Sequence, residues 1–306
     1  MIMKKTILLL TALAGAMVWT GCQKVENVLS PKQEETQDKT YTITVRAEKA
    51  EGPQTKGLAV DGEEATTALL KSIWKAGEEV KVYLGTKCIG TLTATPDGLD
   101  AHKATLSGEI TTTGIVANTT TLTLLTPRDT WDYTGQVGAL LLSDDPTNSI
   151  EKKYHYTMAS GVLVTGVSGN NITTADASFS NKQGIWRLSF TYASAAINAK
   201  SVTISGAAGK LVRSQVVDGS STNGDISVTL GTATTDPFFV ALRNDYMATE
   251  QITFTVVDNT GVTYRGTKTI PASRKSNGVF LSMKNTTLSQ RLELSLSSTT
   301  EVTTVL

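Results

Sequence analysis

From Trp186 to Tyr192 the sequence reads Trp-Arg-Leu-Ser-Phe-Thr-Tyr, and this stretch decides the fold. Large apolar side chains occupy every second position, and polar side chains occupy the positions between them. Successive side chains of a β-strand point to opposite faces of its sheet, so this alternation predicts a strand with one buried and one solvent-facing side. Strands of this kind are typical of antiparallel sheets.

The same alternation recurs on both sides of this stretch. It is found at 41–45, 80–84, 202–204, 226–230, 252–256 and 279–283. Gly, Asn, Asp and Pro separate these segments at intervals of roughly ten residues, and helical periodicity of useful length is absent. The run Phe238–Leu242 is continuously apolar and predicts an interior strand. We therefore expect an all-β fold built of antiparallel β-sandwiches.

The chain is long enough for two domains of ordinary size, at 306 residues. A Gly- and Asn-rich segment, 166–171, suggests a boundary between them. We expect an N-terminal sandwich over residues 40–168 and a C-terminal sandwich over residues 169–306.

The N-terminus has the pattern of a secretory signal peptide. Two lysines precede an apolar run from Ile7 to Trp19, and small residues then lead to Cys22. This run is shorter than the ~20 apolar residues that span a bilayer. We therefore interpret residues 1–21 as an export signal.

Cys22 directly follows Thr20 and Gly21, which resembles a bacterial lipobox. That resemblance implies that the cysteine carries acyl chains, which would attach the protein to the outer membrane at the cell surface. The alternative is an ordinary signal peptide with an incidental cysteine. Residues 22–39 are too poor in apolar side chains to fold and predict a polar tether.

Charge and cysteine content exclude several classes of protein. The 28 basic and 28 acidic residues leave no basic field for nucleic acid. After Cys22 the chain has one further cysteine, Cys88, so an intramolecular disulfide is not expected. Cys88 is interpreted as a small apolar strand residue.

No pattern of catalytic or metal-binding residues stands out. His102 and His155 have no further ligand at zinc spacing, and Gly166–Asn170 lacks the last glycine of a nucleophile elbow. The acidic segment 218–225 has the wrong spacing for a calcium loop and predicts a plain hairpin turn. We expect a non-enzymatic protein without cofactor or metal.

One loop places two aromatic residues close together, Trp131 and Tyr133. Aromatic rings stack on sugars, which makes these two residues a candidate contact for host or bacterial surface glycans. The alternative is that Trp131 covers the edge of the sandwich, because aromatic side chains are more often packed than displayed.

Five short segments resemble the fimbrillin-like lipoproteins of Bacteroides and its relatives. Trp74–Tyr83 looks like that family's Trp-x-x-Gly-Asp/Glu stretch before an early strand, and Asn277–Met283 looks like its closing strand, with Phe280 for the usual Tyr. The other three segments are Thr55–Gly57, Leu106–Ile110 and Thr134–Gly138, the last of which lies where the family often carries a Gln.

This resemblance implies two tandem transthyretin-like sandwich domains in a subunit or anchor of fimbriae, with other fimbrial subunits as partners. In polymerising members an Arg-specific protease removes the first strand, and a strand of the next subunit takes its place. Arg46 is the corresponding candidate cleavage point, and residues 286–306 are the candidate donor strand. The leucines of that segment are Leu288, Leu292, Leu294 and Leu296.

Simpler interpretations remain open for both features. Arg46 fits a solvent-facing strand position, and residues 286–306 fit the last strand of their own domain. Cleavage after Arg46 would also separate the folded body from Cys22. A stalk subunit must be cleaved and an anchor must keep its lipid, and the sequence does not decide between the two.

Overall fold

The computed structural model describes residues 37–49, 58–60, 67–98, 102–126, 130–138, 147–207, 211–217, 220–243, 251–270 and 278–292. The predicted signal peptide and Cys22 lie outside this part of the chain. From Gln37 onward the contacts form one compact unit. Within the described residues, no helix is long and apolar enough to cross a membrane.

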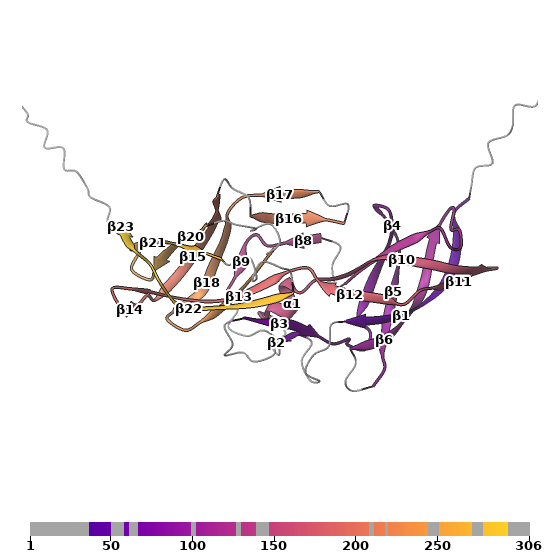
Figure 1. Ribbon diagram of the computed structural model, residues 1–306, viewed down its shortest axis with the longest axis horizontal. Helices are drawn as coiled ribbons and strands as arrows, with labels where there is room; N and C mark the ends of the chain where they lie inside the picture. Colours follow the sequence, from indigo (N-terminus) through magenta and orange to yellow (C-terminus); the bar gives the residue numbers. More distant parts are fainter. Residues whose placement is uncertain are drawn as a thin grey trace, which may run out of the picture. The chain divides into compact units, whose positions relative to one another are not determined.

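The fold is all-β, as the sequence predicts, and its largest sheet has eight strands (Figure 1). These strands, the first sheet, are β1 (Lys39–Lys49), β4 (Glu79–Leu84), β5 (Lys87–Pro96), β6 (Lys103–Thr112), β7 (Thr121–Thr126), β10 (Thr157–Ser168), β11 (Asn171–Thr174) and β12 (Ala177–Asn181).

The ladders of the first sheet close on themselves through β1. Along the path β11-β1-β12-β10-β7-β4-β5-β6, the last strand pairs back to β1. β1 runs antiparallel to β6 over ten residue pairs and parallel to β11 and β12 on its other side. Closure leaves no free edge there, which a sheet otherwise has to protect.

The remaining strands form three further sheets. The second sheet consists of β14 (Ala195–Ala196), β13 (Gly184–Tyr192), β22 (Val279–Thr287), β3 (Thr67–Ser72) and β2 (Leu58–Val60), with β19 (Phe238–Leu242) also paired to β13. The third consists of β23 (Gln290–Leu292), β21 (Thr263–Thr269), β20 (Gln251–Asp258), β15 (Ala199–Gly206), β18 (Ile226–Thr234) and β9 (Gln136–Val137). The fourth consists of β17 (Ser221–Asn223), β16 (Val212–Val216) and β8 (Thr130–Asp132).

Two hydrophobic cores lie among these sheets. The first core collects inward residues of the first sheet together with Trp74, and the second collects residues of the second and third sheets. The buried face predicted around Trp186 is confirmed, because Trp186, Leu188 and Phe190 are buried in the second core. The opposite face is less exposed than predicted, since Arg187 is partly exposed but Ser189 is buried.

The chain does not pass from one core to the other at a single point. β11 and β12 follow the boundary expected at 168/169, yet both pair with β1 in the first sheet. In the opposite direction, β3 from the N-terminal half pairs with β22 of the second sheet. Turn residues such as those at 166–171 mark where a chain reverses, and here they join β10 to β11. The division into two transthyretin-like domains stays a prediction.

The structure adds local detail to these expectations. Residues Ile150–Tyr154 form a short helix, α1, with the hydroxyl of Ser149 accepting a hydrogen bond from the Lys152 amide. β16 ends at Val216 and pairs antiparallel with β17, which begins at Ser221, in agreement with the hairpin expected in this region. β17 is then followed by β18, which belongs to another sheet. Cys88 lies in strand β5 and is exposed.

Candidate functional site

β1 is the element of this fold with the strongest case for a functional role. Its inward side chains fill the first core, and Tyr41, Ile43, Val45 and Ala47 are all buried. Fully burying one apolar side chain of this size contributes about 1.5–3 kcal/mol. β1 therefore closes the ladder and completes the first core at the same time.

Arg46 lies where β1 changes partner on its parallel edge. β11 pairs with β1 up to Thr44, and β12 begins to pair at Ala47. On the antiparallel edge Arg46 is opposite Thr105 of β6. The Arg46 side chain is exposed, which agrees with both interpretations of this residue, a cleavage point and a solvent-facing strand position.

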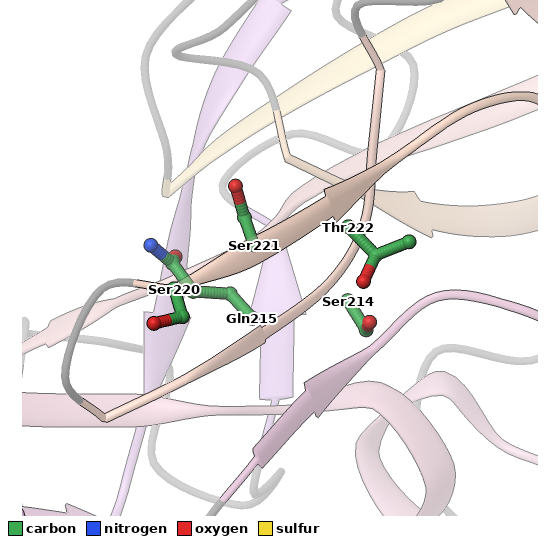
Figure 2. Close-up of a pocket in the computed structure, with 5 residues that line it drawn as sticks. All are labelled: Ser214, Gln215, Ser220, Ser221 and Thr222. Carbon is green, nitrogen blue, oxygen red and sulfur yellow. The ribbon is translucent and has the colours of Figure 1, made fainter. Parts of the chain in front are cut away.

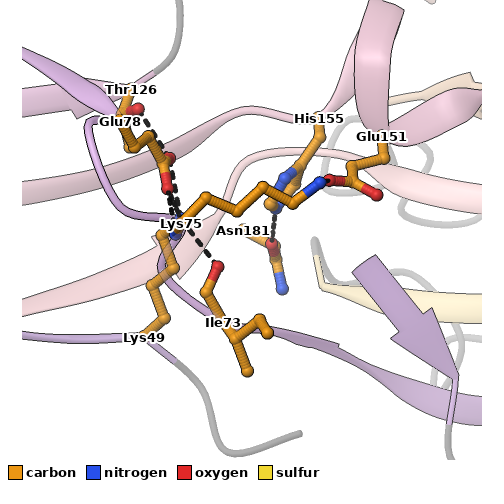
Figure 3. A network of polar contacts seen from close by, with 8 residues as sticks. All are labelled: Lys49, Ile73, Lys75, Glu78, Thr126, Glu151, His155 and Asn181. Carbon is orange, nitrogen blue, oxygen red and sulfur yellow. Dashed lines mark hydrogen bonds and ion pairs between the residues drawn. The ribbon is translucent and has the colours of Figure 1, made fainter. Parts of the chain in front are cut away.

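The last residue of β1, Lys49, is a buried cation (Figure 3). Its Nζ donates to both carboxylate oxygens of Glu78, at 2.7 and 2.8 Å, and to the carbonyl of Ile73 at 3.2 Å. The same Nζ lies 4.0 Å from the centroid of the Trp74 ring. Glu78 also accepts a hydrogen bond of 2.8 Å from the hydroxyl of Thr126. We call Lys49, Trp74, Glu78 and Thr126 the Lys49 cluster.

The electrostatics of this cluster are those of a satisfied buried ion pair. Burial lowers the pKa of the Lys49 amine, and the charge of Glu78 opposes that shift. Burial raises the pKa of the Glu78 carboxyl, but the charge and hydrogen bonds of Lys49 outweigh it and hold that pKa below its ordinary value. Because an ammonium group has three donors and here meets three acceptors, we assign the ion-paired form at neutral pH.

A second layer of polar residues surrounds the cluster (Figure 3). Lys75 forms an ion pair with Glu151 of α1. Nε2 of His155 shares a hydrogen bond of 3.0 Å with Oδ1 of Asn181, at the end of β12. Burial lowers the pKa of His155 to about 4, so its imidazole is neutral at pH 7. Charged groups thus continue from Lys49 at the end of β1 to Glu151 in α1.

The sequence pattern identified the Trp74–Tyr83 stretch but not Lys49, the residue that this stretch contacts. The structure shows what the stretch does locally, since Trp74 and Glu78 both hold the Lys49 amine. A signal for Lys49 was present, because it occupies the fifth inward position of the alternation that begins at Tyr41. A lysine at an inward position requires a buried partner, which the spacing alone does not identify.

The candidate donor segment is divided by the structure. Thr286 and Thr287 end β22 and pair with β13, and Leu288 is buried in the second core. Gln290–Leu292 forms β23, paired with β21, and Leu292 is exposed. The described part of the segment therefore completes sheets of its own chain. Leu294 and Leu296 lie outside the described residues.

The two candidate glycan contacts differ. Tyr133 is fully buried, its hydroxyl donates to the carbonyl of Lys182 at 3.0 Å, and its ring packs edge-on against Tyr156. The ring therefore offers no face to a sugar, and its assignment as a glycan contact is corrected. Trp131 lies in β8, directly opposite Gln215 of β16.

Gln215 lines a small recess beside this strand pair (Figure 2). The other lining residues carry hydroxyl groups, and they are Ser214, Ser220, Ser221 and Thr222. Its volume is about 170 Å³. Small-molecule sites are usually larger, at roughly 300–1,000 Å³. Among the described residues there is no group of three side chains that could hold a metal ion.

No protein-family model and no curated protein matches the sequence. Solved structures do resemble the chain. A candidate cell adhesion protein from Bacteroides ovatus is 12% identical, with 83% of this chain and 97% of that chain covered and a TM-score of 0.36. A candidate adhesin from the same organism is 9% identical, with 90% and 99% covered and a TM-score of 0.37. The tip fimbrial protein Mfa3 from Porphyromonas gingivalis, with a C-terminal truncation, is 8% identical, with 78% and 86% covered and a TM-score of 0.29.

Proposed function

We propose that this chain is a non-enzymatic, fimbrillin-like surface lipoprotein that serves as a subunit or anchor of fimbriae and assembles by strand exchange. The observation that carries the proposal is the position of β1. It closes the first sheet with ladders on both edges and contributes Tyr41, Ile43 and Val45 to the first core. Loss of this strand would expose two edges and three apolar sites, which an extended segment of another subunit can fill.

Assembly is tested by cleaving the purified chain with an Arg-specific protease and imaging the products by electron microscopy. The wild-type chain is expected to form assemblies of high mass. Arg46→Lys keeps the positive charge but removes the cleavage point, and should stay monomeric. Arg213→Lys, a change at another exposed arginine, should assemble like the wild type. A cleaved wild-type chain that stays monomeric would contradict strand exchange.

The donor is tested with a deletion that spares the described sheets. Because Leu288 is buried in the second core and β23 ends at Leu292, the deletion should begin at residue 293. Removal of 293–306 should leave the melting temperature unchanged within a few degrees and abolish assembly. Assembly without these residues would identify a different donor.

Lipid attachment at Cys22 is a separate part of the proposal. Metabolic labelling with a fatty acid should mark the wild-type chain and not a Cys22→Ser variant. Electron microscopy of the outer membrane of cells that carry wild-type chain or Arg46→Ala then separates the roles. A stalk subunit loses its fimbriae in Arg46→Ala, whereas an anchor keeps them.

The alternative function is glycan binding at Trp131. The observation that favours keeping it is the register that places Trp131 opposite Gln215, which lines the recess. Affinity electrophoresis in gels that contain surface glycans tests it, with Trp131→Ala expected to lose retention. Tyr133→Phe is the control, because a buried ring should not affect binding. Absence of retention of the intact protein would dismiss this alternative.

A further inference from the structure

The two halves of β1 are held in the sheet by different forces. Residues 39–46 contribute three large apolar side chains, and the polar contacts at their outer end are exposed. There Lys39 donates to the carbonyl of Gly169 at 2.8 Å, and the hydroxyls of Thr40 and Thr111 lie 3.0 Å apart. Exposed contacts of this kind add little to stability. This half depends mainly on hydrophobic burial and on its ladder.

The last three residues, Ala47–Lys49, are fixed by the Lys49 cluster. They pair with β6 on one side up to Glu48 and with β12 on the other. The Lys49 amide donates to the carbonyl of His102 at 2.7 Å, and its side chain ends in the ion pair with Glu78. Withdrawal of Lys49 would leave Glu78 as a buried charge without its cation, which is strongly unfavourable.

Arg46 lies directly before this fixed segment, and a cut after Arg46 separates the two halves. The residues before the cut become a free peptide that can dissociate and gain translational and rotational freedom. Ala47–Lys49 remains covalently part of the body and keeps all of its contacts. The cut therefore falls between the part of β1 held by hydrophobic burial and its ladders and the part held in addition by a buried ion pair.

We propose that the Lys49 cluster is a latch that divides β1 at Arg46 into a segment that leaves, residues 39–46, and a segment that stays, Ala47–Lys49. The vacated groove then has three apolar sites, those of Tyr41, Ile43 and Val45, and Ala47 closes its end. The latch thereby sets the register of an incoming strand, whose third apolar side chain must lie next to Ala47.

The partner that fits this groove is an extended strand with three apolar side chains at alternate positions. This step rests on the proposed strand exchange. Residues 292–296 of a second copy have that pattern, with leucine at 292, 294 and 296.

Native-state hydrogen exchange of the intact chain tests the latch independently of assembly. The amides of 47–49 should exchange only through global unfolding, and those of 40–45 at least about tenfold faster through local opening. In Lys49→Met both groups should exchange together, faster than the amides of β7. Lys39→Met is the matched control at the exposed end of the same strand and should keep the difference. A β1 that exchanges as one unit in the wild type would overturn the proposal.

Amine acylation followed by mass spectrometry gives a second readout on the full chain. Before and after Arg-specific cleavage, Lys49 should react at least about a hundredfold more slowly than the exposed Lys39. Reaction of Lys49 at the Lys39 rate after cleavage would show that the latch opens. If Lys49 stays protected but no assemblies form, the latch stands and strand exchange fails.

Discussion

The side-chain amide of Gln136 forms the two backbone hydrogen bonds with Ala241 that a neighbouring strand would otherwise form. Its Oε1 accepts a hydrogen bond from the Ala241 amide at 3.0 Å, and its Nε2 donates to the Ala241 carbonyl. The same Nε2 donates to the carbonyl of Tyr133 at 3.0 Å. In the described part of the chain β19 pairs with β13, so the Gln136 amide supplies hydrogen bonds to the backbone of a fully buried strand.

Replacement of Gln136 by Leu should lower the free energy of unfolding by about 2–4 kcal/mol. The substitution leaves the amide and carbonyl of Ala241 without these partners inside a buried strand, and each buried unpaired group costs about 1–3 kcal/mol. Urea unfolding followed by circular dichroism measures the change. Gln251→Leu, on an exposed position of β20, is the control and should change stability by less than about 0.5 kcal/mol. Equal losses in the two variants would contradict the role of Gln136.

The ion pair of the Lys49 cluster should show strong energetic coupling. Lys49→Met alone should cost about 3–5 kcal/mol, because it leaves Glu78 charged and buried. The double variant Lys49→Met with Glu78→Leu replaces the pair by apolar groups and should be more stable than Lys49→Met alone. A double-mutant cycle on urea-unfolding free energies checks this. Losses that simply add would show that the two groups do not depend on each other.

Stability should fall as the pH falls below about 6.5, owing to His155. The ordinary pKa of 6.5 applies in the unfolded chain, while burial lowers the folded value to about 4. Between these values the unfolded state binds a proton that the folded state rejects, so stability decreases by up to about 1.4 kcal/mol per pH unit. Below the folded pKa this contribution becomes constant.

Urea unfolding at pH 7.5, 6, 5 and 4 measures this slope. His155→Gln should remove the part of this slope that one proton contributes, which is up to about 1.4 kcal/mol per pH unit. His102→Gln, at the half-buried second histidine of the chain, is the control and should retain it. A slope that persists in His155→Gln would assign the acid sensitivity to other groups.

Gly90→Ala should destabilise the closed first sheet. A Cβ at Gly90 would lie against the Glu109 carbonyl and 2.8 Å from Cγ2 of Ile110, so β5 and β6 would have to separate. Overpacking of this kind costs about 1–3 kcal/mol. Gly231→Ala is the matched control, because a Cβ there meets open space in another strand. Thermal unfolding should show a lower melting temperature for Gly90→Ala alone.

The sequence predicted the strands of this fold better than their partners. The alternation of Tyr41, Ile43 and Val45 is confirmed, because successive side chains of a strand point to opposite faces whatever its partners are. Phe238–Leu242 is fully buried as predicted, but the Gln136 side chain that serves it lies 105 residues away from Ala241. Pairing partners are set by the whole fold, which a single sequence pattern does not encode.

The candidate site shows the same division. Arg46 was named from the family resemblance, and its exposed position in β1 fits a cleavage point and a solvent-facing strand residue equally, so cleavage there stays a prediction. The Lys49–Glu78 pair was not found, because its two residues lie 29 positions apart and neither has a distinctive spacing. Tyr133 was made a candidate glycan contact because aromatic rings stack on sugars, whereas in the structure the residue is buried and its hydroxyl donates to the carbonyl of Lys182. Burial of a polar aromatic residue depends on such a partner.

The strands on the two sides of β1 run in opposite directions, since β6 is antiparallel to β1 and β11 and β12 are parallel to it. A strand that satisfies both edges has to enter in the direction of β1. Copies joined at this position would therefore all face the same way, and the contact would be heterologous, with different surfaces on the two partners. An assembly built from such contacts has two different ends. One end would always present a vacant groove, and the other would present a strand that is not yet inserted.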